Sequence, residues 1–219
     1  MAYREPLEWP HKNLAKVSEP VKDFDENLQT LLIDLEDTLR IKQGAGLAAP
    51  QIGFSQRVMI IDCSPFDFNN PDKESSPLKD ENIWVIINPK ISDTRGSVKW
   101  EEGCLSVPWH TTVVERFADL TLEYQTPDGT VKIMDLEFPI SGAVQHEADH
   151  LDGKLYLDRI GKLTASRIKK SISKKRKKLV DFKADLLRDP SDKKVTRIKK
   201  LAHLSRKERK KRKMHRRSR

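Results

Sequence analysis

The pentapeptide His146-Glu147-Ala148-Asp149-His150 constrains this chain more than any other feature. Its pattern is H-E-x-x-H. Side chains four positions apart lie on one face of a helix, so both histidines can reach one metal ion. Glu147 then lies beside that ion, where it can exchange a proton with a bound water molecule. The simpler alternative for so short a motif is an amphipathic helix with two structural histidines.

The residues around the pentapeptide favour the metal site. Apolar residues flank it at spacings that suit a buried helix, namely Ile140, Ala143, Val144 and Leu151. Two histidines and two carboxylates on a buried helix are costly unless something pairs them. A divalent cation would do so, and the sequence therefore predicts a metal-binding helix of a hydrolase.

A hydrolytic metal site needs a third protein ligand, commonly His, Glu or Cys, and one open position. The chain has two cysteines, Cys63 and Cys104. Cys63 ends an apolar run and is interpreted as a residue of a buried strand. Cys104 follows two carboxylates and a glycine in the run EEGCLS, which is typical of a loop or strand edge. Because no C-x-x-C occurs, we do not expect a structural zinc ribbon.

A third segment, Gly44 to Gly53, reads GAGLAAPQIG. It is not a dinucleotide-binding fingerprint, because no strand leads into it and the glycine spacing differs. A simple glycine-rich turn is one interpretation. The other is that the glycines let a second backbone approach closely, as a peptide substrate does when it lies alongside as an added strand.

The three segments GAGLAAPQIG, EEGCLS and QHEADHLDG, in this order, closely resemble the three motifs of the peptide deformylases. The stretch from Pro6 to Val21 also looks like that family's opening, and the resemblance covers about residues 1–165. It implies removal of the formyl group from the N-terminal formylmethionine of newly made peptides. The products are formate and a peptide with a free N-terminal methionine.

The resemblance also implies a role for each matched residue. The implied metal ligands are Cys104, His146 and His150, with water as the fourth. Glu147 matches the general base and acid, while the side-chain amide of Gln51 and the backbone N–H of Leu105 match the oxyanion donors. The implied substrate-binding residues are Gly44, Ala45, Gly46, Glu102 and Gly103. Arg116 is placed as a partner of Glu102.

The resemblance favours Fe²⁺ as the metal. A thiolate and two imidazoles would equally suit Zn²⁺, Ni²⁺ or Co²⁺. By the same resemblance, the segment Phe138 to Ala143 lines the pocket for the methionine side chain. Gly142 and Ala143 are small, so this pocket is either roomy or filled from elsewhere in the chain.

Charge divides the chain into two parts. Residues 159–219 hold 27 Lys and Arg against 5 Asp and Glu, a net charge of +22, whereas residues 1–158 hold 15 against 28, a net charge of −13. We therefore predict a catalytic domain over residues 1–160 and a basic extension over residues 161–219, helical and then disordered. A solvated, mobile tail is one interpretation. The favoured one is binding to ribosomal RNA and to proteins near the exit tunnel. Dense positive charge binds polyanions, and the resemblance implies a C-terminal helix that docks at the ribosomal exit.

The predicted fold class is α+β, with mostly antiparallel strands packed around the metal-binding helix. Turn signals, apolar periodicity and helix caps give the expected elements. Helices are expected at about 25–42, 139–152 and 163–188, with a further helical stretch at 191–213, strands at 58–62, 83–88, 112–124 and 130–137, and a loop or surface insertion at 64–81.

Three observations suggest where the protein works. No run of roughly eighteen apolar residues occurs, so we expect no membrane-spanning helix. The first residues lack the apolar region of a signal peptide. Few cysteines, one of them wanted as a thiolate, fit a reducing cytoplasm. The expected location is the cytoplasm, in association with the ribosome.

Two other functions remain open at this point. A zincin-type peptidase shares H-E-x-x-H but needs a downstream His or Glu as its third ligand. The later histidines, His203 and His215, lie in the basic extension. Alternatively, the body is inert and the chain acts as a ribosome- or RNA-binding protein. The intact set of predicted catalytic residues argues against that interpretation.

Overall fold

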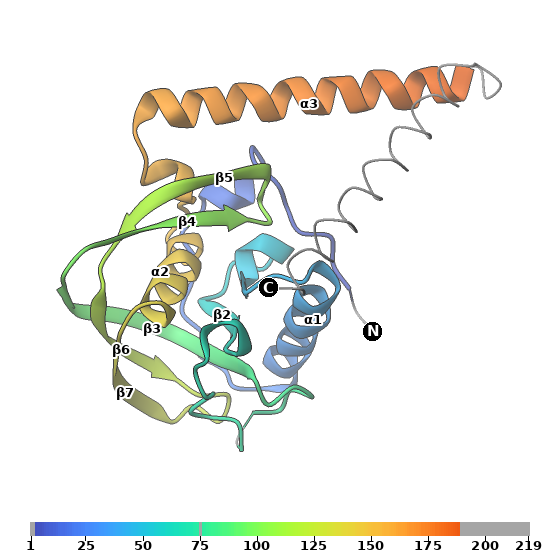
Figure 1. The fold of residues 1–219 in the computed structure, drawn as a ribbon. Coiled ribbons are helices and arrows are strands. Elements are labelled where there is room, and N and C mark those ends of the chain that lie inside the picture. Colours follow the sequence, from blue (N-terminus) through green and yellow to red (C-terminus); the bar gives the residue numbers. More distant parts are fainter. Residues whose placement is uncertain (1–2, 75, 189–219) are drawn as a thin grey trace, which may run out of the picture. The chain divides into compact units, whose positions relative to one another are not determined.

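The computed structural model describes residues 3–74 and 76–188. Within them the chain forms an α+β fold with antiparallel sheets, as predicted (Figure 1). One sheet has five strands in the order β1-β2-β3-β6-β7, and a second pairs β4 with β5. The chain divides into two compact units, Met1–Ile168 and Lys169–Arg219. A domain boundary at residue 160 stays a prediction.

Helix α1 (Glu26–Lys42) covers one face of the five-stranded sheet. The side chain of Asp25 caps its first turn by accepting hydrogen bonds from the backbone N–H groups of Asn27 and Leu28, as the predicted helix start requires. Its buried leucines share a core with Val58 and Val85. These two valines belong to β2 (Val58–Asp62) and β3 (Ile83–Arg95), which pair antiparallel.

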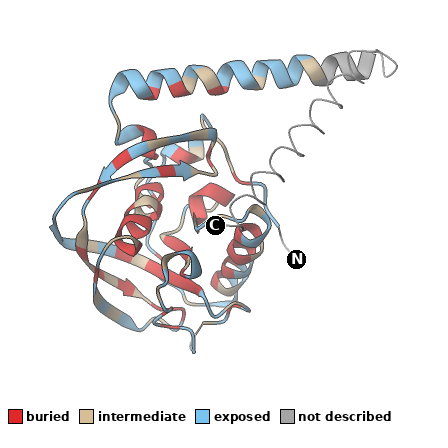
Figure 2. Ribbon diagram, viewed as in Figure 1, coloured by how far each residue is buried: buried red, intermediate tan, exposed pale blue. Residues whose placement is uncertain are grey.

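Helix α2 (Ile140–Leu151) covers the opposite face of the same strands. Here Met59 of β2 and Trp84 of β3 share a second core with Val144 of the helix. Because helices cover both faces, β2 is buried from Val58 to Ile61, which explains its uninterrupted apolar run. Figure 2 shows this burial on the central strands and on both helices. The helix that carries the H-E-x-x-H pentapeptide is therefore fixed by the protein's core.

The prediction of one continuous strand at 112–124 was wrong. The chain leaves β5 (Val107–Arg116), which pairs with β4 (Val98–Cys104), and enters β6 (Asp119–Gln125), which pairs with β3 and with β7 (Val131–Leu136). Two residues, Phe117 and Ala118, make this change of sheet. The side chain of Gln145 bonds the backbone of Phe117, and Ser141 Oγ donates to the Ala118 carbonyl at 2.6 Å. Contacts from α2 thus make the break, and strand periodicity cannot reveal them.

Other elements agree with the sequence or extend it. Helices α1 and α2 and strands β2 and β7 lie where they were expected, and α3 spans Lys162–Arg188. Strand β3 runs past its expected end at residue 88, and the short strand β1 (Gly46–Ala48) and strand β4 were not predicted. The second helical stretch at 191–213 lies outside the described residues. No helix in the described part is long and apolar enough to cross a membrane.

The expected loop at 64–81 begins with a short 3-10 helix, Ser64–Phe66, and is anchored by Asp72. This carboxylate is buried and accepts hydrogen bonds from Trp84 Nε1 at 3.2 Å and from the Tyr124 hydroxyl at 2.7 Å. Lys132 of β7 pairs with it as well. The carboxylate therefore ties the loop to three strands of the large sheet.

Replacing Asp72 with Ala should lower the free energy of unfolding by about 2–4 kcal/mol, because it leaves buried donors of Trp84 and Tyr124 without an acceptor. Urea denaturation would measure the loss. Glu74→Ala, which removes an exposed carboxylate from the same loop, should change stability by less than about 0.5 kcal/mol. Equal effects of the two substitutions would contradict the anchoring role.

Candidate metal centre

Helix α2 brings His146 and His150 to one face, with ring centroids 5.3 Å apart. Cys104 reaches the same place from β4, and its Sγ lies 3.3 Å from Nε2 of His150. The potential ligand atoms of these three residues all lie within 4.8 Å of one another. Across residues 3–74 and 76–188 no other group of His, Cys, Asp and Glu side chains converges in this way. A thiolate and two imidazoles at this spacing fit a divalent transition metal.

A shift in strand register aims Cys104 at the helix. The pairing of β4 with β5 is regular from Val98 to Gly103 and then shifts, so that Cys104 faces Val107. Such irregularities re-aim a side chain at the end of a strand. The backbone N–H of Ser106 donates to the Cys104 sulfur at 3.4 Å and holds the sulfur in this position.

Glu102 orients the first histidine. Its Oε2 lies 2.7 Å from Nδ1 of His146, and a carboxylate can only accept, so Nδ1 carries the proton and Nε2 is free to ligate. Arg116 donates to both oxygens of Glu102, at 2.7 and 3.0 Å, and also to Asp149 at 2.6 Å. The pairing of Arg116 with Glu102 is thereby confirmed.

The charge state of Glu102 follows from these contacts. Burial raises the pKa of its carboxyl group, but the hydrogen bonds from His146 and Arg116 outweigh burial and bring the pKa to about 2. The side chain is therefore an anion at neutral pH. Its negative charge, buried beside His146, makes that imidazole a stronger electron donor.

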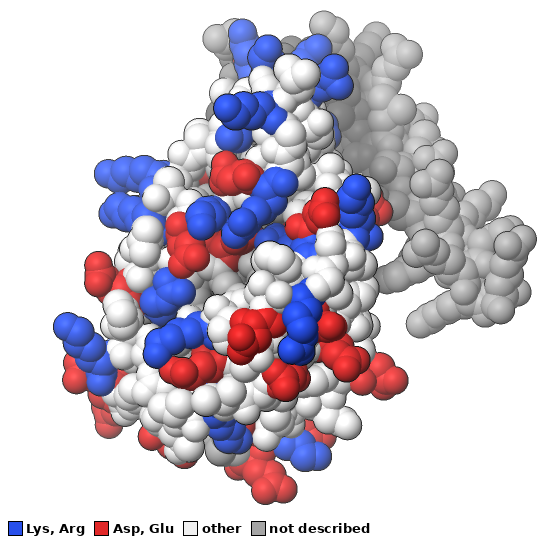
Figure 3. Space-filling view, turned by 90° about the vertical axis from the view of Figure 1, so that its left-hand side faces the viewer, with Lys and Arg blue, Asp and Glu red and all other residues white. Residues whose placement is uncertain are grey.

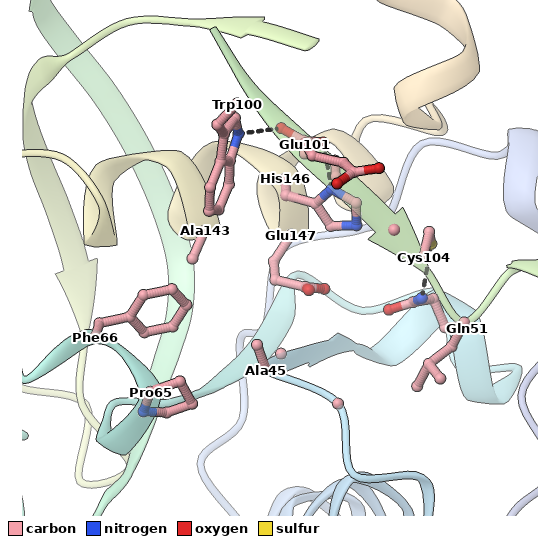
Figure 4. Close-up of a pocket in the computed structure, with 15 residues that line it drawn as sticks. Ala45, Gln51, Pro65, Phe66, Trp100, Glu101, Cys104, Ala143, His146 and Glu147 are labelled. Carbon is pink, nitrogen blue, oxygen red and sulfur yellow. Dashed lines mark hydrogen bonds and ion pairs between the residues drawn. The ribbon is translucent and has the colours of Figure 1, made fainter. Parts of the chain in front are cut away.

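Glu147 lies on the same helix and points into the same space (Figure 4). It is buried, and its Oε2 has no hydrogen-bond partner within the described part of the chain. Burial raises the pKa of its carboxyl group to about 7, so it can take up and release a proton near neutral pH. Gly46 makes room for it, because a Cβ at that position would lie 2.6 Å from Glu147 Oε1.

Gln51, in the short 3-10 helix Ala49–Ile52, presents its amide nitrogen to the cluster. Its Oε1 accepts a hydrogen bond from the backbone N–H of Ala48 at 2.8 Å, which fixes the direction of the amide group. Its Nε2 then donates to the Ser106 hydroxyl at 3.2 Å and lies 3.6 Å from the Cys104 sulfur. The donor is thus held in place by the protein's own hydrogen bonds.

These groups line one cavity of about 350 Å³. The predicted residues among its walls are Gly44, Ala45, Gly46, Gln51, Glu102, Gly103, Cys104, Leu105, Ala143, His146 and Glu147. His150 is not a wall residue; it is almost fully buried behind Cys104. Pro65, Phe66 and Trp100 also line the cavity and were not predicted. Trp100 could have been found, because side chains two apart on a strand share a face and Glu102 was already a candidate.

A buried carboxyl group beside a cysteine and histidine cluster, within an antiparallel α+β fold, defines a class of metal-dependent hydrolases. Comparison with known proteins narrows that class. Residues 4–166 match the family described as polypeptide deformylase. The chain therefore belongs to the polypeptide deformylase family, which confirms the resemblance of its three motifs, and it is an enzyme of the hydrolase class.

Individual relatives agree with this assignment. A peptide deformylase of Helicobacter pylori strain J99 is 38% identical over 178 residues, which cover 81% of this chain and 98% of the relative. One from Novosphingobium aromaticivorans is 38% identical and covered to 99%. A crystal structure of a peptide deformylase from Legionella pneumophila has a TM-score of 0.71 at 35% identity and covers 82% of this chain and 98% of that one. The enzyme from Ehrlichia chaffeensis in complex with actinonin has a TM-score of 0.69 at 30% identity, covering 80% and 98%.

The two alternative functions find no support. A zincin-type peptidase requires a downstream His or Glu, whereas the third residue of the cluster is Cys104, from the strand before the helix. His203 and His215 lie outside the described residues. An inert RNA-binding body is not supported either, since the relatives are enzymes and the predicted catalytic side chains converge on one cavity.

Glu102→Ala should lower the free energy of unfolding by about 3 kcal/mol, because it leaves part of the buried Arg116 guanidinium without a counter-charge. This loss of stability is at the lower end of the range for a broken buried ion pair, because Asp149 still pairs with Arg116. Chemical denaturation of both proteins at pH 7 would measure it. Glu101→Ala, at the exposed neighbouring position, is the matched control and should cost less than about 1 kcal/mol. A cost for Glu102→Ala no larger than that of the control would refute the network's stabilising role.

Proposed function

We propose that this chain removes the formyl group from the N-terminal formylmethionine of newly made peptides, using the cluster of Cys104, His146 and His150 as its metal site. The observation that carries the proposal is the position of this cluster beside Glu147, in a chain of the polypeptide deformylase family. Water is the second substrate, and formate and the methionyl peptide are the products. The enzyme acts co-translationally in the cytoplasm.

The three ligand side chains would hold Fe²⁺, which the motif resemblance favours, and would accept Zn²⁺, Ni²⁺ or Co²⁺ in its place. When bound, such a cation acidifies a water molecule and polarises the formyl oxygen. The protein contributes the open side of the cluster, which faces the cavity. It also contributes the fixed tautomer of His146, set by Glu102.

Glu147 moves the proton. It accepts a proton from the attacking water as the water oxygen bonds to the formyl carbon. It then donates that proton to the amine nitrogen as the carbon–nitrogen bond breaks. One group serves as base and then as acid, which works best when its pKa lies near the working pH, and burial brings that of Glu147 to about 7.

Gln51 and Leu105 stabilise the oxyanion that develops on the formyl oxygen. The amide nitrogen of Gln51 is aimed at the cluster by the hydrogen bond that Ala48 gives to its oxygen. Leu105 follows Cys104 in the cavity wall and offers its backbone N–H. Donors placed in advance are effective because they need no rearrangement during the reaction, and losing one typically costs about 3–4 kcal/mol.

The peptide binds as an added strand. Strand β1 is the edge strand of the large sheet, and its first residue, Gly46, lines the cavity together with the preceding Gly44 and Ala45. Gly103 of β4 lines it as well. Glycine and alanine leave the backbone open, so a substrate chain can form main-chain hydrogen bonds there.

The basic extension, residues 161–219, binds the ribosome at ribosomal RNA and proteins near the exit tunnel. In its described part, α3 exposes Lys170, Lys174, Lys177 and Lys178. Their spacing places them on one face of the helix, as a stripe of positive charge suited to phosphate groups. On the face shown in Figure 3, basic and acidic side chains of the body are interspersed. The separation of charge in this protein therefore lies between two segments of the sequence, residues 1–158 and 159–219.

Enzymatic activity is tested by formate release from formyl-Met-Ala-Ser, with protein purified without oxygen and loaded in parallel with Fe²⁺, Ni²⁺ and Zn²⁺. We expect release with at least one metal and a loss of more than about 100-fold in Glu147→Ala. Cys104→Ala should lose stoichiometric metal binding, while Cys63→Ala, at a buried site away from the cluster, should keep it. Absence of release despite full metal loading would overturn the proposed function.

Deleting residues 190–219 removes 15 Lys and Arg and should weaken ribosome binding. Each lost phosphate contact lowers the slope of log affinity against log salt by roughly 0.7–0.9, so several lost contacts would be plain in a salt titration. Formate release from the tripeptide is the control and should not change. An unchanged affinity and salt slope would refute a ribosome-binding role for these residues.

A further inference from the structure

Ser106 is a buried residue of the EEGCLS segment to which the motif resemblance gives no role. It lies two positions after Cys104, in the turn between β4 and β5. None of its surface is exposed, and it is not a wall residue of the cavity. It therefore cannot touch a substrate. Its hydroxyl, its backbone N–H and its carbonyl all make hydrogen bonds, and two of these reach side chains of the site.

The hydrogen bonds around Gln51 fix which end of its amide group faces Ser106. The backbone N–H of Ala48 can only donate, so the atom that faces it at 2.8 Å is the amide oxygen. The amide nitrogen then lies 3.2 Å from the Ser106 hydroxyl and 3.6 Å from the Cys104 sulfur, a contact drawn in Figure 4. An amide nitrogen carries two hydrogens. One N–H is therefore taken by Ser106, and the other is left on the side of the cluster.

One segment near the N-terminus holds the backbones of both residues. The N–H of Leu7 donates to the Gln51 carbonyl at 2.7 Å, and the N–H of Trp9 donates to the Ser106 carbonyl at 2.8 Å. Leu7 and Trp9 are two positions apart, so covalent geometry limits the separation of the two carbonyls that they bind. The hydroxyl of Ser106 is thus carried by a backbone that cannot drift away from that of Gln51.

We propose that Ser106 is a positioning residue of this enzyme: its hydroxyl accepts one N–H of the Gln51 amide and so directs the other N–H to the oxyanion. This inference rests on the proposed function and deepens it. The hydrogen bond from Ala48 holds the oxygen end of the amide, and a group held at one end can still swing about that end. The bond to Ser106 holds the nitrogen end. A donor fixed in advance needs no rearrangement as charge develops during the reaction.

The test removes the hydroxyl alone. Ser106→Ala keeps the backbone N–H that donates to the Cys104 sulfur, so stoichiometric metal binding should not change. We expect kcat for formyl-Met-Ala-Ser to fall about tenfold with KM unchanged, since loss of a whole oxyanion donor costs roughly 10²–10³ in kcat. A fall of less than about twofold would overturn the proposal.

Thr126→Val is the matched control. It removes a buried hydroxyl that donates to the Thr130 carbonyl in the turn between β6 and β7, away from the cavity. It should leave kcat within about twofold of the wild type, because loss of one buried hydrogen bond at a distant site changes stability and not the placement of Gln51. A fall in the control as large as that in Ser106→Ala would count against the positioning role.

A double variant shows whether Ser106 acts through Gln51. Once Gln51→Leu has removed the amide, Ser106→Ala should change kcat by less than about twofold, because the group that it positions is gone. Two effects that multiply would mean that Ser106 acts by another route, and the proposal would fail. If Ser106→Ala does not fold, Ser106→Thr and Ser106→Val replace it, since they add similar bulk and only valine lacks the hydroxyl. We then expect kcat to be about tenfold lower with valine than with threonine, and equal values would contradict the proposal.

The amide can also be observed without turnover, which separates this inference from the proposed function. In protein loaded with Zn²⁺, the Gln51 side-chain signals are those missing from the proton–nitrogen NMR spectrum of Gln51→Leu. We expect these N–H groups to exchange with water at least about fivefold faster in Ser106→Ala than in the wild type. This expectation holds even if the wild type releases no formate from any peptide, the result that overturns the proposed function. Equal exchange rates in the two proteins would overturn the positioning role, whether or not the protein is active.

Discussion

The carboxylate of Glu102 links the small sheet to the helix that carries the two histidines of the cluster. It stands on β4, accepts two hydrogen bonds from Arg116 on β5, and reaches His146 on α2. Arg116 continues to Asp149, which also pairs with Arg159 near the surface. Two carboxylates are thus balanced by the buried guanidinium group of Arg116 and the half-exposed one of Arg159, and the buried anions do not stand alone.

Buried ion pairs are weak evidence for stability, because an apolar replacement of similar shape is often as stable. Their value here lies in geometry. The small sheet contacts the rest of the protein partly through charged side chains whose hydrogen bonds have fixed directions. These bonds define how β4 lies against α2, and therefore how the sulfur of Cys104 lies relative to the two imidazoles. A purely apolar contact would permit more sliding between strand and helix.

The sequence predicted much of the fold and named the three residues that the structure brings together in the cluster, for physical reasons that differ between elements. Helix α2 could be predicted because its apolar periodicity and its H-E-x-x-H spacing agree. Helix α1 could be predicted because Asp25 caps an amphipathic run. The break between β5 and β6 could not be predicted, since hydrogen bonds from Ser141 and Gln145 to a backbone segment distant in the sequence create it. The anchoring role of Asp72 could not be predicted for the same reason, because the groups that pair with its carboxylate come from three strands remote in the sequence.

In the site, too, the residues that stand in short motifs could be predicted, and those contributed by distant segments could not. Cys104, His146 and Glu147 stand in short motifs whose spacing carries their chemistry, whereas Pro65 and Phe66 enter the cavity from a loop with no motif. Trp100 lies between these cases, two positions before Glu102 on one strand. Because its indole donates to the carboxylate that orients His146, the wall of the pocket and the metal cluster share one fixed anion. The positions of the indole and of the imidazole are therefore coupled through a single buried carboxylate.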